Sequence, residues 1–381
     1  MNKLLLILCV CAVGFAANET YSQEIGTPKT TIETTAKHAV VMDHETGIVL
    51  YDKAAYEPMF PASMTKMMTA YMMFDALKSG KIKLEDTYPV SENAWSKQGS
   101  KMFVTLGDNV AISDLMKGII IQSGNDGCIV FAEGYAGTEE RFAELMTEKG
   151  KEIGLKASIF KNATGWPDEQ HLTTVYDLAM LARKTISDFP EYYAVYSQAE
   201  YVYHNIKQYN RNLLLSRNMG IDGLKTGHTE DAGYGITISG EQQGRRTHVS
   251  VAGLTSEKER ANEAAKLYRY ALTEFRHIDL SGKIIAEIPL WYGAKRQVAA
   301  NTGAQKIVIL PSLQSNFSAN VQYESGLKAP IKKGQLIGAL SIKLEGGVSE
   351  QMLELYASED IDELGFFSRA LENIGLLLAG K

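Results

Sequence analysis

Apolar and polar positions along the chain change their period several times, and each change predicts a different kind of element. Residues 39–53, AVVMDHETGIVLYDK, contain two apolar runs around polar turn residues, which predicts a β-hairpin. A helix is expected from about residue 63 to a glycine at residue 80, and helical patterns dominate residues 109–190. Residues 222–254 contain three β-rich runs separated by glycine-containing turns, and a long amphipathic helix follows them.

This order of elements predicts an α+β fold. A strand pair comes first, a helical block follows, and three strands and a helix end the region, so one sheet is expected to draw strands from both ends of the sequence. After His277 short segments alternate apolar and polar residues with turns between them, which predicts a separate small all-β domain over residues 277–360. A chain of 381 residues is also longer than one hydrophobic core usually serves.

Both ends of the chain carry distinct apolar patterns. In residues 1–16, Lys3 precedes an apolar run too short to span a bilayer, and the segment ends in small residues, which predicts a signal peptide and an exported protein. Residues 17–36 are polar and are expected to form an N-terminal tether. Residues 361–381 predict an amphipathic helix that could lie in a membrane surface. A helix packed on the β domain is the alternative, because the segment carries few basic residues.

The amino-acid composition and the net charge limit the kinds of partner that we expect the protein to bind. With 45% apolar and 22% charged residues the chain is an ordinary globular protein, and its formal net charge of −6 argues against nucleic acid as a partner. Cys128 is the only cysteine beyond residue 16, so no internal disulfide is expected, and its apolar surroundings predict a buried side chain. The seven histidines form no metal-binding motif, and we expect neither a metal nor a cofactor.

The first candidate for chemistry is the segment PASMTKMMTA, which begins at Pro61. Ser63 and Lys66 are three residues apart, so on a helix they lie side by side on one face. A serine at a helix N-terminus lies where free N–H groups and the helix dipole favour an oxyanion, and a neighbouring lysine can accept the hydroxyl proton when burial keeps it neutral. The alternative is that Ser63 is only a helix N-cap and Lys66 only a surface lysine. A serine followed by a lysine three residues later occurs twice elsewhere in the chain.

Two further motifs make the pattern specific. Ser123 and Asn125 form an S-x-N motif that follows an apolar GIII segment, and residues 225–227 form the only K-T-G in the chain, beside predicted strands. Each motif is weak alone. The order S-x-x-K, S-x-N and K-T-G, with the first motif opening a buried helix, is typical of penicillin-binding proteins and serine β-lactamases.

On these motifs the chain resembles the D-alanyl-D-alanine carboxypeptidases, the low-molecular-mass penicillin-binding proteins. The segments PASMTKMMTAY, GIIIQSGNDGC, NRNLLL and DGLKTGHT carry the resemblance, which is close over about residues 37–275. It implies a catalytic domain over residues 37–276 with the serine β-lactamase/DD-peptidase-like fold: an antiparallel sheet flanked by helices, plus a helical lobe. It also implies a stem peptide ending in D-Ala-D-Ala as substrate, β-lactam antibiotics as covalent inhibitors, and a location in the periplasm or at the outer face of the cytoplasmic membrane.

The resemblance also implies roles for the residues around the reacting bond. Ser63 would attack the carbonyl of the penultimate D-Ala and form an acyl-enzyme, with Lys66 as its general base. Ser123 would relay a proton toward the leaving amine, and Asn125 would hold the amide of the substrate.

The remaining implied roles concern the terminal carboxylate and the oxyanion. Lys225 would supply positive potential that helps to keep the neighbouring lysine neutral, while Thr226, next to Gly227 of the same motif, and Arg260 would bind the carboxylate. The backbone N–H groups of His228 and of the nucleophile would form the oxyanion hole. Arg260 has an alternative interpretation as a surface ion-pair residue, because glutamates surround it on its helix.

Asp177 and Arg211 resemble scaffold residues of the family, and we expect them to hold the loop around residues 166–171. Two rival functions stay open at this point. A class A β-lactamase needs a deacylating glutamate in an E-x-x-L-N pattern, and EQHLT at Glu169 comes close but lacks the asparagine. Gly124 also stands where such an enzyme usually has aspartate. A non-catalytic penicillin-binding sensor is the other rival, although all three motifs are intact.

Overall fold

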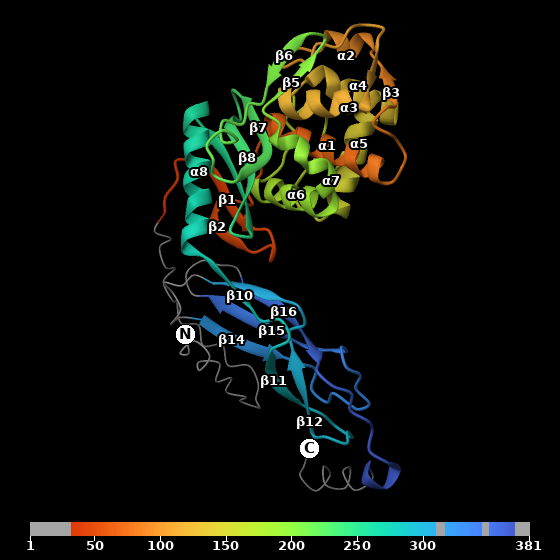
Figure 1. Cartoon of the computed structure of the whole chain (residues 1–381), viewed down its shortest axis with the longest axis vertical. Helices are drawn as coiled ribbons and strands as arrows, with labels where there is room; N and C mark the ends of the chain where they lie inside the picture. The colour runs from red at the N-terminus through yellow and green to blue at the C-terminus, as the bar shows by residue number, and fades with distance from the viewer. Residues whose placement is uncertain (1–31, 310–316, 345–349, 370–381) are drawn as a thin grey trace. The chain divides into compact units, whose positions relative to one another are not determined.

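The computed structural model describes residues 32–309, 317–344 and 350–369. Its contacts divide the chain into two compact units, with the boundary between residues 273 and 274 (Figure 1). The predicted signal peptide, most of the predicted tether and the last part of the predicted terminal helix lie outside the described residues.

The first unit is built on a five-stranded sheet with the order β2-β1-β9-β8-β7, in which all neighbours are antiparallel. The strands are β1 (His38–Asp43), β2 (Val49–Lys53), β7 (Ile221–Thr229), β8 (Gly233–Gln242) and β9 (Arg245–Leu254). The predicted hairpin and the three predicted strands are therefore confirmed. Strand β7 forms an edge of this sheet.

Both faces of the sheet are covered, which explains why its strands are apolar at successive positions rather than at alternate ones. Figure 1 shows α8 (Glu257–Glu274) along one face and the helical lobe beyond the other. Val40 and Met42 of β1 point toward α6 (Val175–Asp188), where they pack with Leu178 in a buried cluster. The residues between them, such as Val41, are buried as well.

The helical lobe lies between the two halves of the sheet in the sequence. Its elements are η1 (Ala62–Thr65), α1 (Lys66–Lys78), β3 (Thr87–Pro89), α2 (Glu92–Ser96), β4 (Asn109–Ala111), α3 (Ile112–Lys117), η2 (Gly118–Gln122), α4 (Asn125–Ala136), α5 (Glu139–Glu152), α6, α7 (Pro190–Tyr193), η3 (Ala194–Ser197), β5 (Glu200–Tyr203) and β6 (Ile206–Tyr209). Helix α1 is buried at nearly every position, and α4 is buried over residues 125–132, because these segments lie in the centre of the lobe. Cys128 is one of the buried residues of α4, as predicted.

The carboxylate of Asp126, in α4, is buried and binds the loop between α2 and β4. Asp126 is fully buried and accepts hydrogen bonds from the backbone N–H groups of Met102 (2.8 Å), Phe103 (2.9 Å), Val104 (3.2 Å) and Gly127 (2.9 Å). Four donors compensate for the loss of water around the charge. Asp126, the residue after Asn125, therefore holds residues 102–104 against the start of α4.

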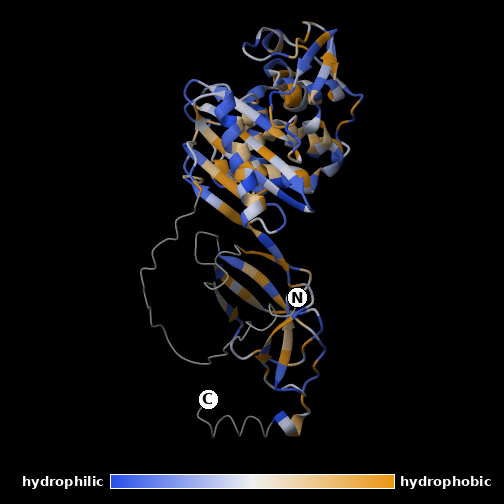
Figure 2. Ribbon diagram, turned by 60° about the vertical axis from the view of Figure 1, so that its left-hand side comes forward, coloured by the Kyte–Doolittle hydropathy of each residue, from blue (hydrophilic) through white to orange (hydrophobic). Residues whose placement is uncertain are grey.

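The second unit is the predicted small all-β domain. It contains β10 (Arg276–Asp279), β11 (Ile284–Pro289), β12 (Gln297–Asn301), β13 (Lys306–Ile309), β14 (Phe317–Gln322), β15 (Leu336–Leu344) and β16 (Gln351–Ala357). Five strands form a sheet in the order β11-β12-β16-β15-β14, and β10 pairs with β13. Apolar and polar residues alternate along these strands (Figure 2), and on β16 the side chains of Leu353 and Leu355 are buried while Met352 is exposed. This is the pattern of a sheet with one face in the core.

The described part of the terminal helix begins after Gly365. Phe366 and Phe367 are 80% and 83% exposed. Within the described residues, no helix combines the length and the apolar composition that crossing a bilayer requires.

We predict that Asp126→Asn lowers the free energy of unfolding by about 3 kcal/mol, because an amide group turns a donor toward backbone donors and leaves buried N–H groups unpaired. The measurement is urea unfolding followed by circular dichroism. Glu144→Gln, which removes an exposed ion pair with Arg141, is the matched control and is expected to change little. Equal stability of the two variants would contradict the role assigned to Asp126.

Candidate active site

Ser63 and Lys66 lie at the junction of η1 and α1. Ser63 is in the 3-10 turn η1, and Lys66 is the first residue of α1, so the predicted helix begins as a 3-10 turn before it becomes α-helical. The Lys66 Nζ is 2.9 Å from the Ser63 Oγ. The i, i+3 spacing places the two groups in hydrogen-bond contact even though the first turn is wound more tightly than an α-helix.

The Lys66 amine is fully buried and has two more oxygen partners. It donates to the Asn125 Oδ1 at 2.8 Å and to the Thr164 carbonyl oxygen at 2.7 Å. A neutral amine has two N–H donors and one lone pair, so it can satisfy both carbonyl oxygens and still accept the proton of the serine hydroxyl. Burial, with the positive charge of Arg211 adding to it, lowers the pKa of Lys66 from 10.5 to about 8.

The Thr164 carbonyl is aimed at Lys66 by a tight turn. The Asn162 Oδ1 accepts hydrogen bonds from the N–H groups of Thr164, Gly165 and Trp166 at 2.8–3.1 Å. Gly165 has φ +80°, and a Cβ there would lie 1.8 Å from the Ala62 carbonyl oxygen. Only glycine therefore allows this loop to approach the backbone that carries the nucleophile.

A buried histidine holds the other end of the same loop. The His171 Nδ1 accepts a hydrogen bond from the Lys161 N–H at 3.1 Å, so the Nε2 carries the proton and donates to the Thr65 Oγ1 at 2.9 Å. Burial lowers the pKa of His171 to about 4, although the charge of Asp168 opposes the shift. His171 is thus neutral near pH 7 and positions the loop.

The S-x-N motif lies where a π-helical turn meets α4. Ser123 ends η2 in the left-handed conformation, with φ 66°, and its buried Oγ has no hydrogen-bond partner among the described residues. Asn125 is the first residue of α4, and its Nδ2 donates to the Gln98 carbonyl oxygen at 2.8 Å. At Gly124 a Cβ would lie 2.9 Å from the Asp126 Oδ1. That contact explains why this chain has glycine where a β-lactamase usually has aspartate.

The K-T-G motif lies on the edge strand β7. The Lys225 side chain is buried and makes one long hydrogen bond of 3.3 Å to the Thr226 carbonyl oxygen. Burial, followed by the charges of Lys66, Arg211 and Arg260, lowers the pKa of Lys225 well below its usual value. These positive groups therefore lie close enough to repel one another.

Gly227 allows β7 to pack against the segment before the nucleophile. A Cβ at Gly227 would lie 2.8 Å from the Pro61 carbonyl oxygen and 3.2 Å from the Ala62 Cβ. The glycine of the motif is thus required by the close approach of two backbones. This approach brings the residue after it, His228, to the same part of the sheet as the Ser63 turn.

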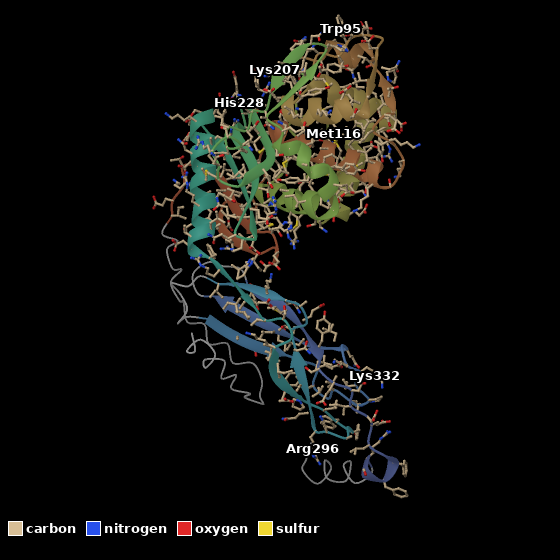
Figure 3. The ribbon with its side chains drawn as sticks, viewed as in Figure 1. Trp95, Met116, Lys207, His228, Arg296 and Lys332 are labelled. Atoms are coloured by element: carbon tan, nitrogen blue, oxygen red, sulfur yellow. The ribbon has the colours of Figure 1, made fainter. Side chains whose placement is uncertain are left out.

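Arg260 belongs to this end of β7 and is not a surface ion-pair residue. Only 3% of Arg260 is exposed, and its nearest carboxylate oxygen, on Glu257, is 3.9 Å away. Its guanidinium lies over the Tyr234 ring at 5.7 Å, and that ring stacks on His228 with centroids 3.8 Å apart. Figure 3 shows His228 near the upper end of α8. The buried Nε of Arg260 has no partner among the described residues.

Asp177 and Arg211 differ from the prediction. The Asp177 carboxylate binds the N–H groups of Lys156 and Ala157 and the hydroxyl of Ser158, so it holds the segment before the 166–171 loop rather than the loop itself. The charge of Arg211 lowers the pKa of both site lysines.

Sequence reasoning missed Thr164, which acts through a backbone carbonyl. The N-x-x-G turn signal at residues 162–165 was the available clue.

Known proteins are similar to this chain in sequence and in fold. A sequence model of the D-alanyl-D-alanine carboxypeptidase family matches residues 23–255, and a model of the penicillin-binding protein 5 C-terminal domain matches residues 277–363. The chain belongs to the D-alanyl-D-alanine carboxypeptidase family. The predicted family, fold class and enzyme class, a serine-type carboxypeptidase, are thereby confirmed.

Individual relatives match both the sequence and the fold of much of the chain. The D-alanyl-D-alanine carboxypeptidase DacC of Escherichia coli is 37% identical over an alignment of 345 residues, and the match covers 88% of this chain and 86% of the relative. The structure of penicillin-binding protein 5 from Haemophilus influenzae is 34% identical, covers 88% of this chain and 99% of its own, and has a TM-score of 0.78. Penicillin-binding protein D2 of Listeria monocytogenes, in its cefotaxime-bound form, is 25% identical, with a TM-score of 0.59 over 64% of this chain and 99% of its own.

Proposed function

We propose that the protein removes the terminal D-Ala from peptidoglycan stem peptides through an acyl-enzyme on Ser63. The observation that carries this proposal is the 2.9 Å contact between the Ser63 Oγ and a buried Lys66 amine whose other two partners are carbonyl oxygens. In that environment the neutral amine takes the hydroxyl proton while the oxygen attacks the carbonyl of the penultimate D-Ala. The C–N bond to the terminal D-Ala then breaks, its nitrogen takes up a proton, and free D-Ala leaves the acyl group as an ester on Ser63. Water then releases the shortened peptide.

The unpaired polar groups near Lys225 support a binding site for the terminal carboxylate. The ammonium of Lys225 has one long hydrogen bond, and the Arg260 Nε has none among the described residues, although both groups are buried. Buried cationic donors without partners are costly, and a carboxylate would satisfy them. Thr226 adds a hydroxyl donor on the same strand. Lys225, Thr226 and Arg260 are therefore assigned to the carboxylate.

Ser123 and Asn125 are assigned to the proton relay and to the substrate amide. The Ser123 Oγ is buried and has no partner within the described part of the chain, so it is free to exchange hydrogen bonds with a leaving amine. One N–H of the Asn125 amide binds Gln98, and the second is available to a peptide carbonyl.

The edge position of β7 supports extended binding of the substrate. Its outer backbone groups are not used by the sheet, so an extended peptide can pair with them. We assign the oxyanion hole to the backbone N–H groups of Ser63 and His228. β-Lactams, which acylate such serines, are the expected covalent inhibitors.

We also propose that the protein is exported after cleavage at residue 16 and acts in the periplasm or at the outer face of the cytoplasmic membrane. The catalytic domain is assigned to residues 37–276 and the β domain to residues 277–360. The terminal helix is assigned to the membrane surface, because the two exposed phenylalanines at its start present apolar rings to solvent.

Ser63→Ala is expected to abolish D-Ala release from a peptide ending in D-Ala-D-Ala and to abolish covalent labelling by a fluorescent penicillin. Both reactions need the same oxygen nucleophile. The readouts are amino acid analysis and in-gel fluorescence, with Ser91→Ala, which alters an N-cap serine of α2, as the control. Labelling that persists in the Ser63 variant would identify a different nucleophile.

The acylation rate is expected to rise with pH to about 8 and then to level off. Lys66 acts as a base only when neutral, so below its pKa of about 8 the active fraction falls roughly tenfold for each pH unit. Stopped-flow acylation by a chromogenic β-lactam measures this profile. Lys66→Arg is expected to stay unreactive at every pH, because a guanidinium does not lose its proton. A pH-independent rate in the native enzyme would exclude Lys66 as the base.

Phe366→Ser combined with Phe367→Ser is expected to reduce binding of the full chain to phosphatidylglycerol vesicles, because two apolar rings are lost from the interface. Flotation on a density gradient measures the bound fraction. Ile284→Ser, at a side chain that is 54% exposed in the same unit, is the control. Equal flotation of both variants and the native chain would contradict the assignment.

A further inference from the structure

Glu139, the first residue of α5, reaches the turn that approaches Lys66. Its Oε1 accepts a hydrogen bond from the Ala163 N–H at 3.0 Å, and only 12% of its side chain is exposed. Ala163 directly precedes Thr164, whose carbonyl oxygen accepts from the Lys66 amine at 2.7 Å. A carboxylate of the helical lobe is therefore bonded one residue away from a group that holds the general base.

Hydrogen bonds fix three consecutive peptide groups of this turn. The Ala163 N–H belongs to the first and binds Glu139, while the Ala163 carbonyl oxygen belongs to the second and accepts from the Thr69 Oγ1 at 2.7 Å. In the third, the N–H binds the Asn162 Oδ1 and the carbonyl binds the Lys66 amine. Neighbouring peptide groups are joined by only two soft dihedral angles, so the contact at Glu139 restricts the direction in which the third carbonyl points.

The charge of Glu139 is only partly compensated by its partners. Burial raises the pKa of Glu139, whereas the Ala163 N–H and the charge of Lys97 oppose that shift. The neighbouring carboxylates of Glu140 and Glu133 act in the same direction as burial. The Lys97 Nζ is 3.8 Å from the Glu139 Oε2, which is long for an ion pair. Part of the field of the carboxylate is therefore left to act on other groups nearby.

The charges that face the Lys66 amine come from four parts of the fold. Burial lowers the pKa of Lys66 most, and Arg211, from the segment before β7, lowers it further. Lys225 of β7 lies close enough for the two lysines to repel each other. The carboxylates of Asp126 on α4 and Glu139 on α5 raise the pKa of Lys66. Negative charge from the lobe thus opposes positive charge from the sheet.

Two other titratable groups near the amine are neutral around pH 7. Burial raises the pKa of the Cys128 thiol to about 12 and lowers that of His171 to about 4. Of the two carboxylates, Asp126 binds four backbone N–H groups and supports the loop that supplies three of them. Glu139 is therefore the negative group whose charge can be changed with less disturbance to the fold.

We propose that Glu139 is a positioning residue for the general base. Its acceptor oxygen holds the 162–165 turn against the Lys66 amine, and its charge favours the ammonium form of that amine. The inference rests on the proposed acylation of Ser63, in which Lys66 takes the hydroxyl proton. A glutamine in place of Glu139 can still accept from the Ala163 N–H but has no charge, whereas an alanine has neither property, so the two contributions can be separated.

Glu139→Gln is expected to move the rise of the acylation rate toward lower pH. Loss of a nearby negative charge favours the neutral amine, so the pKa of Lys66 falls below its native value of about 8 and more of the enzyme is active in acid. Stopped-flow acylation by a chromogenic β-lactam is expected to be about twofold to threefold faster than native near pH 6.5. Above about pH 9 the two rates are expected to agree, because both amines are then neutral.

Glu139→Ala is expected to show the same shift along the pH axis and also a lower rate above pH 9, by about tenfold, because the turn is no longer held at Ala163. Glutamine at the same position is expected to restore that rate. Complete labelling of each variant by a fluorescent penicillin after long incubation reports that the protein is folded. A slower rate with complete labelling then reflects the site rather than the amount of folded enzyme.

Glu140→Gln is the matched control, because it removes the same charge from the next residue of α5, whose side chain is exposed. It is expected to keep the native profile. A Glu139→Gln profile with the native midpoint, or a Glu139→Ala variant as fast as the native enzyme above pH 9, would overturn the proposal. A native rate that does not change with pH would instead remove Lys66 as the base and with it the proposed reaction, so the two failures are distinct.

Discussion

The Lys66 amine is the point on which the catalytic unit depends. A lysine without solvent needs an oxygen partner for each of its protons, and here three different parts of the chain supply them: the Ser63 turn, the start of α4 and the 162–165 turn. The same three contacts suit the neutral amine, which can accept from the serine hydroxyl. The structure thus accommodates both protonation states without moving a residue, which is what a general base requires.

The need to bring oxygen partners to the buried Lys66 amine accounts for much of the surrounding architecture. The sheet brings β7 against the nucleophile turn through Gly227, and the lobe supplies α1 and α4. Asp126 fixes the loop over α4, while Asn162 and His171 fix the loop opposite. Burial and the positive charge of Arg211 lower the pKa of Lys66, while burial and the charges of Lys66, Arg211 and Arg260 lower the pKa of Lys225.

The sequence predicted the strands and most helices well, because their apolar periods are long and regular. Three motifs in fixed order also predicted the residues around Ser63 without any coordinates. It did not predict the hairpin β5–β6, although the sequence HN between YVY and IKQY is a turn signal and His204 and Asn205 both have positive φ. A contact made by a backbone group, such as the Thr164 carbonyl, cannot be predicted from the residue type, because every residue has the same carbonyl. Nor does a sequence pattern reveal that Arg260 is buried, since that depends on how α8 lies against β7.

Cys128 gives the catalytic unit one further property. Its thiol is fully buried in α4, three residues from Asn125, and burial raises its pKa to about 12. In the native fold the thiol is therefore unreactive toward thiol reagents. It reacts only when local unfolding separates α4 from its neighbours. In a chain that begins after residue 16, where Cys128 is the only cysteine, the rate at which a thiol reagent modifies the native protein thus measures how often α4 separates from its neighbours, without any added label.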